Sequence, residues 1–276
     1  MPELPEVEHV TRILDRLLRG RLISGAVLKR ERLAPAHSPE DFSLLISAAV
    51  ISFVHRRGKN ILIDLSTGKT LIVHLRMSGR FMLLAAEVSD PKFAHAVFYL
   101  DRDERLVFED QRHFGFMRIV DTDQLERSPE LAKLAPEPFS EAFSPGYLFA
   151  ASRPVRRSLK EFLLDQTRIC GLGNIYASEA LFLAGVDPRK PAASISKMRA
   201  ARLHASICQV LSEAIEHSSR VEVDPADIGG GYFYGSGPYG WLVYGREDQA
   251  CVNCNRPIIR LKQGGRSTFF CPKCQR

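Results

Sequence analysis

Two pairs of cysteines near the end of the sequence constrain its fold more than any other feature. Each pair has the spacing Cys-x-x-Cys, and sixteen residues separate the pairs: Cys251, Cys254, Cys271 and Cys274. Four thiolates spaced in this way can bind one zinc ion tetrahedrally; two disulfides, or four ordinary buried thiols, are the alternatives. Residues 251–276 are too few to bury a hydrophobic core, so a bound metal would supply folding free energy. Protein would fill all four coordination positions, and we therefore expect a structural zinc ion, not a catalytic one.

The composition is that of an ordinary globular protein. The chain has 276 residues, of which 45% are hydrophobic and 25% charged, enough for one large domain or two ordinary ones. No apolar run is long enough for a transmembrane helix, and the N-terminal residues lack the apolar segment of a secretory signal. The two remaining cysteines, Cys170 and Cys208, fall in apolar helical patterns. This cysteine usage predicts a protein of the reducing cytoplasm.

Positive charge is concentrated at the C-terminal end. The net charge is +6 at pH 7. From residue 245 onward only Glu247 and Asp248 are acidic, whereas the basic residues are Arg246, Arg256, Arg260, Lys262, Arg266, Lys273 and Arg276. A basic zinc-binding segment favours a nucleic-acid partner. A segment that merely solvates its own charges is the alternative.

The first half of the chain has the pattern of an antiparallel sheet. Residues 5–18 have helical spacing and are followed by Gly20, a suitable end for a helix. Between residues 22 and 120, about eight short runs rich in β-branched and aromatic residues alternate with turn residues. The pattern predicts a β-sandwich or barrel with a leading α-helix.

The second half has a different pattern. Residues 125–150 are rich in proline and indicate a hinge, and helical spacing follows. Residues 220–240 are rich in glycine and aromatic residues, which fits either a loop that closes over a ligand or an idle surface loop. We therefore predict an N-terminal domain at 1–124, the hinge, a helical domain at 151–240 with the loop at 220–240, and a zinc finger at 241–276.

A glycine motif precedes one of these helices. Gly171 and Gly173 stand before an amphipathic helix, and Asn174 lies near its N-terminus. Backbone amides and a polar side chain at such a position can bind a phosphate. A tight corner between two helices without a ligand is the alternative. The basic zinc segment favours phosphate binding.

Three motifs taken together resemble the formamidopyrimidine-DNA glycosylase family. They are MPELPEVE at the start, GLGNIYASE in the middle and GRSTFFCPKCQ at the end, and the resemblance covers nearly the whole chain. It implies an α+β multidomain fold: an N-terminal β-sandwich with a leading helix, then a helix-two-turn-helix domain with a C-terminal zinc finger. It also implies a monomeric, bacterial DNA glycosylase and abasic-site lyase of base excision repair. Its partner would be double-stranded DNA with damaged bases or abasic sites.

The same resemblance assigns the chemistry to the start of the chain. Pro2, once Met1 is removed, would be the nucleophile that forms a Schiff base. An α-amino group has a pKa of about 7.7–8.0 against about 10.4 for lysine, so part of it is neutral at physiological pH. Glu3 would act as general acid and base with support from Glu6, and Lys59 would contact the lesion or its phosphate. Without the resemblance, the two glutamates could simply stabilise a helix N-terminus, and Lys59 could lie in a solvated turn.

The resemblance also implies a set of DNA-binding residues. Met77, Arg112 and Phe114 would fill the gap that a flipped base leaves in the duplex. Without the motif, Met77 and Phe114 would be assigned to the core. The remaining positions are phosphate contacts at Asn174 and Arg266, weaker candidates at His74 and Lys160, and an acid near the lesion pocket at Glu179.

The chain departs from the family pattern in three places. His113 stands in a segment that often reads DPRRFG, and Phe93 to His95 replace an HDH-like segment. Residues 220–241 lack the usual GGS-x-RDY stretch. Cleavage of abasic sites and ring-opened purines is therefore expected ahead of strict 8-oxoguanine preference. One alternative is a relative that binds damaged, abasic or branched DNA without cutting it. The other is a zinc-ribbon protein of transcription or translation.

Overall fold

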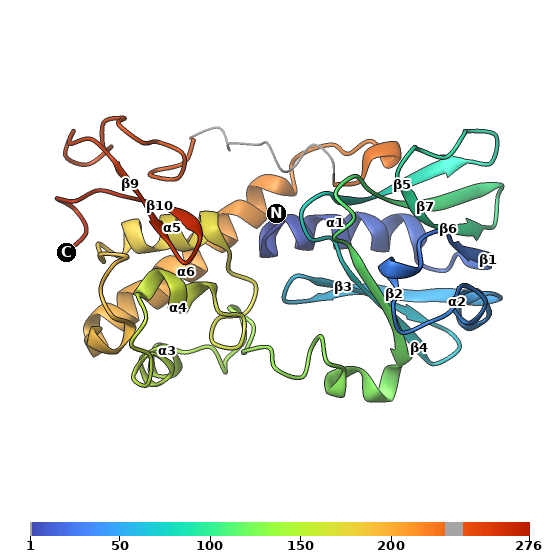
Figure 1. The fold of residues 1–276 in the computed structure, drawn as a ribbon, viewed down its shortest axis with the longest axis horizontal. Helices are drawn as coiled ribbons and strands as arrows, with labels where there is room; N and C mark the ends of the chain where they lie inside the picture. Colours follow the sequence, from blue (N-terminus) through green and yellow to red (C-terminus); the bar gives the residue numbers. More distant parts are fainter. Residues whose placement is uncertain (1, 230–239) are drawn as a thin grey trace. The chain divides into compact units, whose positions relative to one another are not determined.

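The structure is a computed structural model that describes residues 2–229 and 240–276. It divides into two compact units, each built from two segments of the chain: unit 1 is Met1–Ala132 with Ser218–Gly235, and unit 2 is Lys133–His217 with Ser236–Arg276. Figure 1 shows that unit 1 holds the large sheet and unit 2 most of the helices. The domain boundaries predicted from the sequence stay predictions, and most of the predicted 220–240 loop lies outside the described residues.

Unit 1 contains an eight-stranded antiparallel sheet with the order β5-β7-β6-β1-β2-β3-β4-β8. Its strands match the short runs expected from the sequence: β1 (Leu22–Leu28), β2 (Ala49–Arg57), β3 (Asn60–Leu65), β4 (Lys69–His74), β5 (Gly79–Ala85), β6 (Ala94–Leu100), β7 (Glu104–Asp110) and β8 (Phe116–Asp121). The sheet consists of two four-stranded layers, because β1 and β2 pair only at Leu22–Val50 and Ile23–Ala49. Side chains of both layers share one core, among them Ile23, Ile51, Ile63, Phe98 and Leu106. The predicted β-sandwich is therefore confirmed.

The leading helix α1 (Leu4–Leu18) packs into this core. Its buried residues include Val7, Val10 and Leu14, which recur at helical spacing. Pro5 lies in the first turn, where the missing N–H of proline costs no hydrogen bond. After the helix, Gly20 has a φ of +80°, which glycine adopts without strain. Its N–H donates to the carbonyl of Ile51 at 2.8 Å and ties the helix end to β2.

A second segment of the chain completes unit 1. The short 3-10 helix η4 (Pro225–Asp227) is followed by Ile228, which is fully buried and exchanges backbone hydrogen bonds with Phe81 of β5 at 2.8 and 3.2 Å. Arg80 of β5 also pairs with Asp227 at 2.8 Å. Residues far along the sequence therefore cover the edge of β5.

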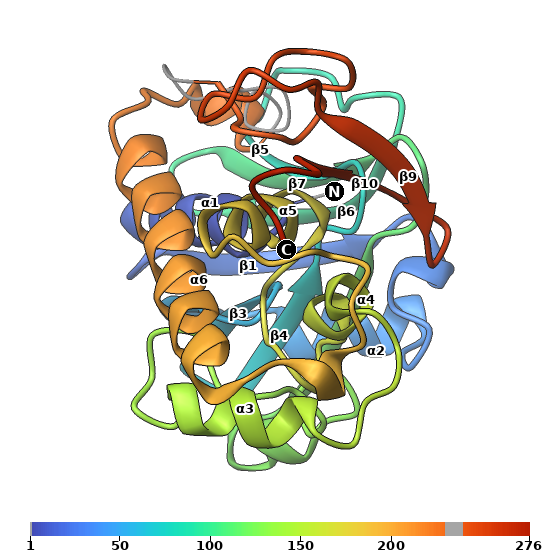
Figure 2. The same ribbon diagram turned by 90° about the vertical axis from the view of Figure 1, so that its left-hand side faces the viewer.

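Unit 2 is built around the helices that the sequence predicts after residue 151. They are α4 (Leu159–Leu164), α5 (Asn174–Leu183) and α6 (Lys197–Ser218), and Figure 2 shows them grouped with α3 (Pro145–Ser152). Two helices were not predicted: α3, which lies in the expected hinge, and α2 (Pro39–Ile46) in unit 1. The remaining 3-10 turns are η1 (Glu31–Leu33), η2 (Thr122–Arg127) and η3 (Ala192–Ser194). None of the helices in the described ranges has the length and hydrophobicity that a membrane crossing requires.

The end of unit 2 is a two-stranded hairpin between the cysteine pairs. Strand β9 (Ile259–Gln263) pairs with β10 (Arg266–Phe270), and Gln263 lies opposite Arg266. The two turn residues, Gly264 and Gly265, have φ values of +52° and +79°. A two-residue turn with positive φ at both positions matches the twist of a hairpin, and glycine adopts it without strain.

Candidate active site and nucleic-acid interface

Pro2 and Glu3 lie directly before α1, and the helix fixes their position. Glu3 is 2% exposed and caps the helix: its side chain accepts the N–H of Glu6, while its own N–H donates to Oε2 of Glu6 at 2.7 Å. This reciprocal pair is a capping box. The first turn therefore holds both predicted glutamates close together beside Pro2, which is also buried. Met1 lies outside the described residues.

Lys59 lies at the tip of the β2–β3 hairpin and is 6% exposed. Gly58, with a φ of +60°, allows the chain to turn there in two residues. The tip is tied to α1: Arg56 donates to Glu8 at 2.8 Å and to the carbonyl of Gly58 at 3.1 Å. Arg56 thus brings the hairpin that carries Lys59 to the end of α1 that carries Glu3. No local pattern predicts the Glu8–Arg56 pair, because the two residues lie 48 positions apart.

His74 ends β4 opposite Asn60, one residue from Lys59. Burial, followed by the charges of Arg76 and Lys59, lowers the pKa of His74 to about 3. The imidazole is therefore neutral at physiological pH. Its Nδ1 accepts the N–H of Arg76 at 3.0 Å, so the proton lies on Nε2. In this state His74 can donate one hydrogen bond, as a neutral contact to a phosphate oxygen requires.

The predicted wedge residues Met77, Arg112 and Phe114 share a polar support. Met77 is 41% and Phe114 54% exposed, so neither is a core residue. Between them lies the fully buried carboxylate of Asp110. Its Oδ2 accepts the N–H of Gly115 at 2.6 Å, and its Oδ1 accepts the N–H of Arg112 at 3.2 Å.

Ser78 joins the two loops that carry these residues. Its hydroxyl donates to Oδ1 of Asp110 at 2.5 Å and accepts the N–H of Arg112 at 3.0 Å. The guanidinium of Arg112 lies 5.3 Å from the ring centre of Phe114, within cation–π range. The structure therefore brings the three predicted residues onto one support. Sequence reasoning missed Asp110 and Ser78. The available signal was their position in the sequence: Ser78 directly follows Met77, and Asp110 lies two residues before Arg112.

In unit 2, Asn174 and Arg266 lie on adjacent elements. Asn174 is the first residue of α5, and its Nδ2 donates to the carbonyl of Ser267 in β10 at 3.0 Å. Arg266, the neighbour of Ser267, is exposed at the start of β10. Among the described residues the buried Oδ1 of Asn174 has no hydrogen-bond partner. A helix N-terminus and an exposed guanidinium in this arrangement suit a phosphate.

Lys160 takes a different position from the one expected of a direct phosphate contact. It is 1% exposed, and its ammonium donates to the carbonyl of Asn174 at 2.8 Å and to the hydroxyl of Ser178. Its charge therefore acts on the first turn of α5. Any contribution to DNA binding would depend on how it positions Asn174.

Glu179 is buried in α5 and holds the segment that follows the undescribed residues. Its carboxylate accepts the N–H groups of Leu242, Val243 and Tyr244 at 2.8, 3.0 and 2.9 Å. Burial raises the pKa of Glu179, and these three hydrogen bonds oppose that shift. The contacts place Glu179 at the entry to the zinc finger. Its predicted role near the lesion stays a prediction.

The four cysteines form a cluster that fits one zinc ion. Their sulfur atoms all lie within 4.8 Å of one another, and the Sγ–Sγ distances are 3.9 Å for Cys251–Cys274 and 3.5 Å for Cys254–Cys271. Tetrahedral Zn–S bonds of about 2.3 Å place sulfurs about 3.8 Å apart. A disulfide would require about 2.05 Å. The geometry therefore excludes the disulfide alternative and matches a four-thiolate zinc site.

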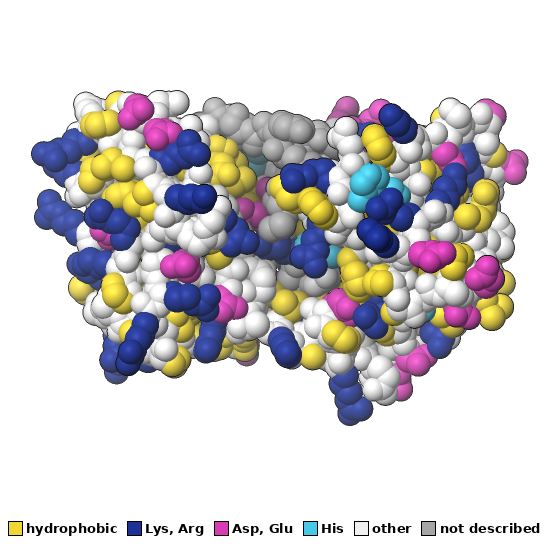
Figure 3. Space-filling model, in the orientation of Figure 1, with side chains coloured by type: hydrophobic (Ala, Val, Ile, Leu, Met, Phe, Trp, Pro, Cys, Tyr) yellow, Lys and Arg dark blue, Asp and Glu magenta, His cyan; other side chains and the backbone are white. Residues whose placement is uncertain are grey.

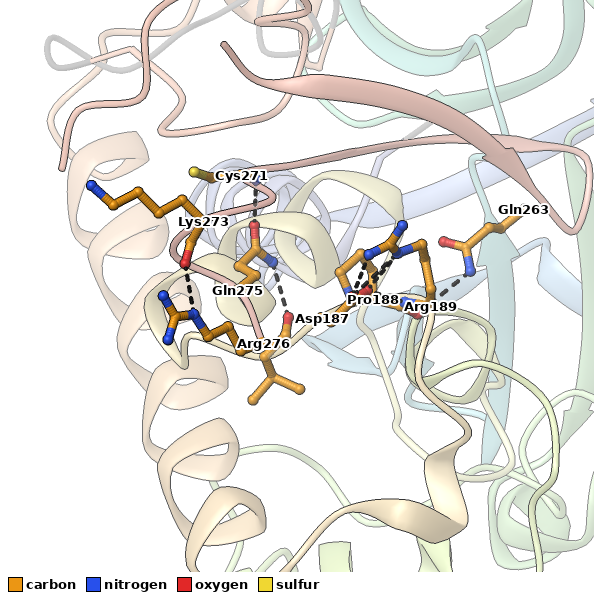
Figure 4. A network of polar contacts seen from close by, with 9 residues as sticks. Asp187, Pro188, Arg189, Gln263, Cys271, Lys273, Gln275 and Arg276 are labelled. Atoms are coloured by element: carbon orange, nitrogen blue, oxygen red, sulfur yellow. Dashed lines mark hydrogen bonds and ion pairs between the residues drawn. The ribbon is translucent and has the colours of Figure 1, made fainter. Parts of the chain in front are cut away.

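The zinc cluster is fastened to the end of α5. Figure 4 shows the side chain of Gln275 directed toward the backbone of Cys271. Its Oε1 accepts the N–H of Cys271 at 2.8 Å, and its Nε2 donates to the carbonyl of Val186 at 3.0 Å. The N–H of Arg276 donates to the carbonyl of Gly185 at 3.1 Å. These hydrogen bonds therefore attach the zinc finger to the residues that follow α5.

Basic side chains are prominent on unit 2. Figure 3 shows many Lys and Arg side chains and fewer acidic ones on the visible face of that unit. Within the zinc finger Arg266 is exposed, and Arg260 pairs with Glu247 at 3.2 Å. The distribution agrees with the polyanionic partner expected from the sequence.

Three family profiles match the chain in order. A profile of the formamidopyrimidine-DNA glycosylase N-terminal domain matches residues 1–117, and one of the H2TH domain of the same enzyme matches residues 134–223. A profile described as a zinc finger found in FPG and IleRS matches residues 248–276. The last match and the four-cysteine cluster agree on one structural zinc ion.

Full-length relatives and solved structures are similar to the whole chain. A formamidopyrimidine-DNA glycosylase of Cereibacter sphaeroides is 43% identical over 288 residues and covers 100% of both chains. One of Desulforamulus reducens is 37% identical, with 100% of this chain and 99% of the relative covered.

Two solved structures are similar over nearly their full length. Lactococcus lactis Fpg in complex with DNA containing N7-benzyl-Fapy-dG has a TM-score of 0.89 and 31% identity, with 99% of both chains covered. The MutM (FPG) protein of Thermus thermophilus has a TM-score of 0.84 and 36% identity, with 99% of this chain and 98% of that chain covered. With the fold, the zinc cluster and these matches in agreement, the chain belongs to the formamidopyrimidine-DNA glycosylase family, the zinc-finger DNA glycosylases of base excision repair.

Proposed function

We propose that this protein removes oxidised or ring-opened purines from double-stranded DNA and then cuts the strand as an abasic-site lyase. The observation that carries the proposal is the first turn of α1. It holds Pro2 beside the buried Glu3, and the hairpin with Lys59 is tied to the same helix through Arg56. A secondary amine next to a carboxylate and a lysine suits covalent catalysis at a sugar carbon.

The reaction would start with the Pro2 nitrogen, after removal of Met1. Its lone pair attacks C1′ of the damaged nucleotide while the bond from C1′ to the base breaks and the base leaves with a proton. Glu3 donates a proton to the ring oxygen O4′, so that the sugar opens and the adduct becomes an iminium. Loss of a C2′ proton then expels the 3′ phosphate, and loss of a C4′ proton expels the 5′ phosphate. The iminium draws electrons from C1′, which makes the first of these eliminations possible.

The supporting residues act by position. Glu6 would hold Glu3 at the N-terminus of α1 through the capping box. Lys59 would contact the lesion or its phosphate. Met77, Arg112 and Phe114 would occupy the space of the flipped nucleotide, because an extruded base leaves an unstacked gap and an unpaired partner. Asn174 and Arg266 would bind phosphates.

Borohydride trapping tests the nucleophile. Wild-type protein incubated with an abasic-site duplex and borohydride should form a stable covalent complex, because the iminium is reduced to an amine. Replacement of Pro2 by Gly, or retention of Met1, should reduce trapping strongly. Lys133→Ala is a matched control, since Lys133 lies outside the first turn of α1. Equal trapping by wild type and both altered proteins would refute Pro2 as nucleophile.

A lesion panel tests the substrate. We expect nicking of abasic sites and excision of formamidopyrimidines ahead of 8-oxoguanine, because the sequence at 220–241 departs from that of members that act on 8-oxoguanine. Excision of 8-oxoguanine opposite cytosine at the rate of abasic nicking would contradict this order. If the protein binds these duplexes tightly but forms no covalent complex with any of them, it is the alternative: a relative that binds damaged DNA without cutting it.

We also propose that the protein works in the bacterial cytoplasm, in association with the nucleoid through DNA. The relatives are bacterial proteins. The cysteine usage of the sequence, with four residues in the zinc pattern and Cys170 and Cys208 in apolar helical patterns, is typical of a reducing compartment. Cell fractionation would test the location.

A further inference from the structure

A pair of histidines in unit 1 has no part in the proposed chemistry. His95, in β6, is 6% exposed, and its Nε2 lies 2.8 Å from the main-chain oxygen of Asp110. The same Nε2 lies 2.9 Å from Nδ1 of His113, in the turn between β7 and β8. The ring centres are 4.9 Å apart. The pair therefore connects a buried strand to the turn that carries Arg112 and Phe114.

These two distances fix the protons on both rings. A main-chain oxygen can only accept, so Nε2 of His95 must carry a proton. Nδ1 of His113 then carries no proton and accepts from the N–H of His95. The proton of the neutral His113 ring therefore lies on its own Nε2. A protonated His113 would carry N–H on Nδ1 and would set it against the N–H of His95 at 2.9 Å. A charged His113 therefore opposes the contact between the two rings.

The groups around the pair add positive charge more than negative charge. Burial lowers the pKa of His95, and the hydrogen bond to the main chain of Asp110 opposes this shift. The electrostatic effects of His113 and Arg30 lower the pKa further, whereas the charge of Asp110 raises it. His113 meets the ring of Phe93 edge-on at 5.7 Å, and the ammonium of Lys92 lies 5.4 Å from that ring. The carboxylate of Asp110, which lies near the pair, already accepts hydrogen bonds from Ser78, Arg112 and Gly115.

His95 is fixed while His113 is free to reach solvent. The carbonyl of His95 accepts the N–H groups of Lys29 and Arg30 at 2.8 and 3.2 Å, so its strand is anchored. His113 is exposed and has a φ of +60°, a conformation that few side chains other than Asn, Asp and His adopt readily. Figure 3 shows histidine side chains at the surface of unit 1, next to Lys and Arg. The exposed partner of the pair is therefore His113.

We infer that His113 is a positioning residue: its neutral ring holds the turn with Arg112 and Phe114 against His95, and its protonation releases that turn. The turn is held while this ring is neutral and is released once the ring carries a second proton. The effect on DNA rests on the role proposed above for Arg112 and Phe114. The proposed protonation state of the histidine pair does not depend on that role.

Nitrogen-15 NMR of the histidine rings in the free full-length protein tests the pair itself. At pH 8 we expect the proton of His113 on Nε2 and that of His95 on Nε2, and the His113 signals should move together with the amide signals of Arg112 and Gly115 as the pH falls. A His113 ring with its proton on Nδ1 at pH 8 would overturn the inference, as would amide signals that do not follow its titration.

Affinity for a duplex with a stable abasic-site analogue, measured from pH 8.0 to 5.5, tests the consequence. His113→Asn keeps an acceptor oxygen, tolerates the positive φ and does not titrate. Wild-type affinity should fall more than that of H113N by roughly fivefold, the worth of about one hydrogen bond. His113→Phe, which has no acceptor, should show the low-pH affinity already at pH 8. Undamaged duplex is the control, and there the three proteins should not differ.

The two measurements separate the possible failures. Equal pH dependence in wild type and H113N, with unmoved turn signals, overturns the inference. If the amide signals of Arg112 and Gly115 follow the His113 signals while DNA affinity does not, the positioning role of His113 is supported. The proposed role of Arg112 and Phe114 in DNA binding is then contradicted.

Discussion

At the scale of single residues, Glu179 shows how much of unit 2 depends on one carboxylate. It accepts three consecutive backbone N–H groups, Leu242 to Tyr244. Replacement by Leu leaves these buried donors without their acceptor, at about 1–3 kcal/mol for each one that finds no water. We expect Glu179→Leu to lower the free energy of unfolding of unit 2 by ~3 kcal/mol. Urea unfolding followed by Trp241 fluorescence measures it, since Trp241 is the only tryptophan.

The matched control is Glu179→Gln. Its amide oxygen still accepts, and it removes the buried charge whose burial raises the pKa of Glu179. The loss in E179Q should therefore be smaller. Equal losses in both variants would contradict the account given for this residue.

His74 predicts the acid sensitivity of unit 1. Its pKa is lowered to about 3, and that of His9 to about 4, from an ordinary value of 6.5. The unfolded chain therefore binds protons between pH 6.5 and 3 that the folded chain does not, so stability is complete above pH 6.5 and is lost as the pH falls. His74→Asn, whose oxygen can still accept from Arg76, should show a smaller loss of melting temperature between pH 7 and 4. Parallel melting curves for wild type and H74N would contradict this.

At the scale of elements, Gln275 ties the zinc finger to the end of α5. It bonds the N–H of one zinc ligand and the carbonyl of Val186. Residues that orient metal ligands typically contribute 10–100-fold to metal affinity. We expect Gln275→Ala to weaken zinc binding by about tenfold, as measured by competition with a chelator. Lys273→Ala, a change at an exposed neighbour, should leave zinc affinity unchanged; equal effects would show that Gln275 has no special part.

Most elements could be predicted from the sequence because their pattern is local. The strands of unit 1 alternate or run as short apolar segments, and α1 has a regular apolar stripe. The helices α2 and α3 were missed although Ser38 and Ser144 cap them and proline follows each serine. Both have eight residues, too few to establish a period, and the prolines around α3 favoured a hinge.

The support of the candidate site was harder to predict. Asp110 and Ser78 lie 32 positions apart, and Glu8 and Arg56 lie 48 apart. Only the folded sheet brings them together, so no local pattern could show them. The buried position of Lys160 has the same cause. A lysine between Leu159 and Glu161 in the sequence does not reveal that Ser178 and the carbonyl of Asn174 will accept its hydrogen bonds.

At the scale of the whole molecule, the zinc site and the proposed catalytic residues belong to different units. The cysteine cluster, Asn174 and Arg266 lie in unit 2, whereas Pro2, Glu3 and Lys59 lie in unit 1. Chelation of zinc should release the β9–β10 hairpin, since the segment cannot bury a core of its own. We expect a large loss of DNA affinity, while the circular dichroism of the sheet and the melting of unit 1 change little. Zinc loss that leaves affinity intact would contradict the role given to Arg266.

The return of the chain to unit 1 has a consequence for synthesis. Ile228 covers the edge of β5, and the chain reaches it only after the helices of unit 2 have been made. Until then the N–H and carbonyl of Phe81 on the edge of β5 lack these partners, a state that invites pairing with other chains. A fragment that stops at Ala132 would leave this edge of β5 uncovered, even if all eight strands of its sheet had formed. The sheet that carries the proposed active site therefore cannot be finished on the ribosome before the helical unit has emerged, so dissecting this enzyme at the apparent unit boundary should yield aggregation rather than an isolated catalytic domain.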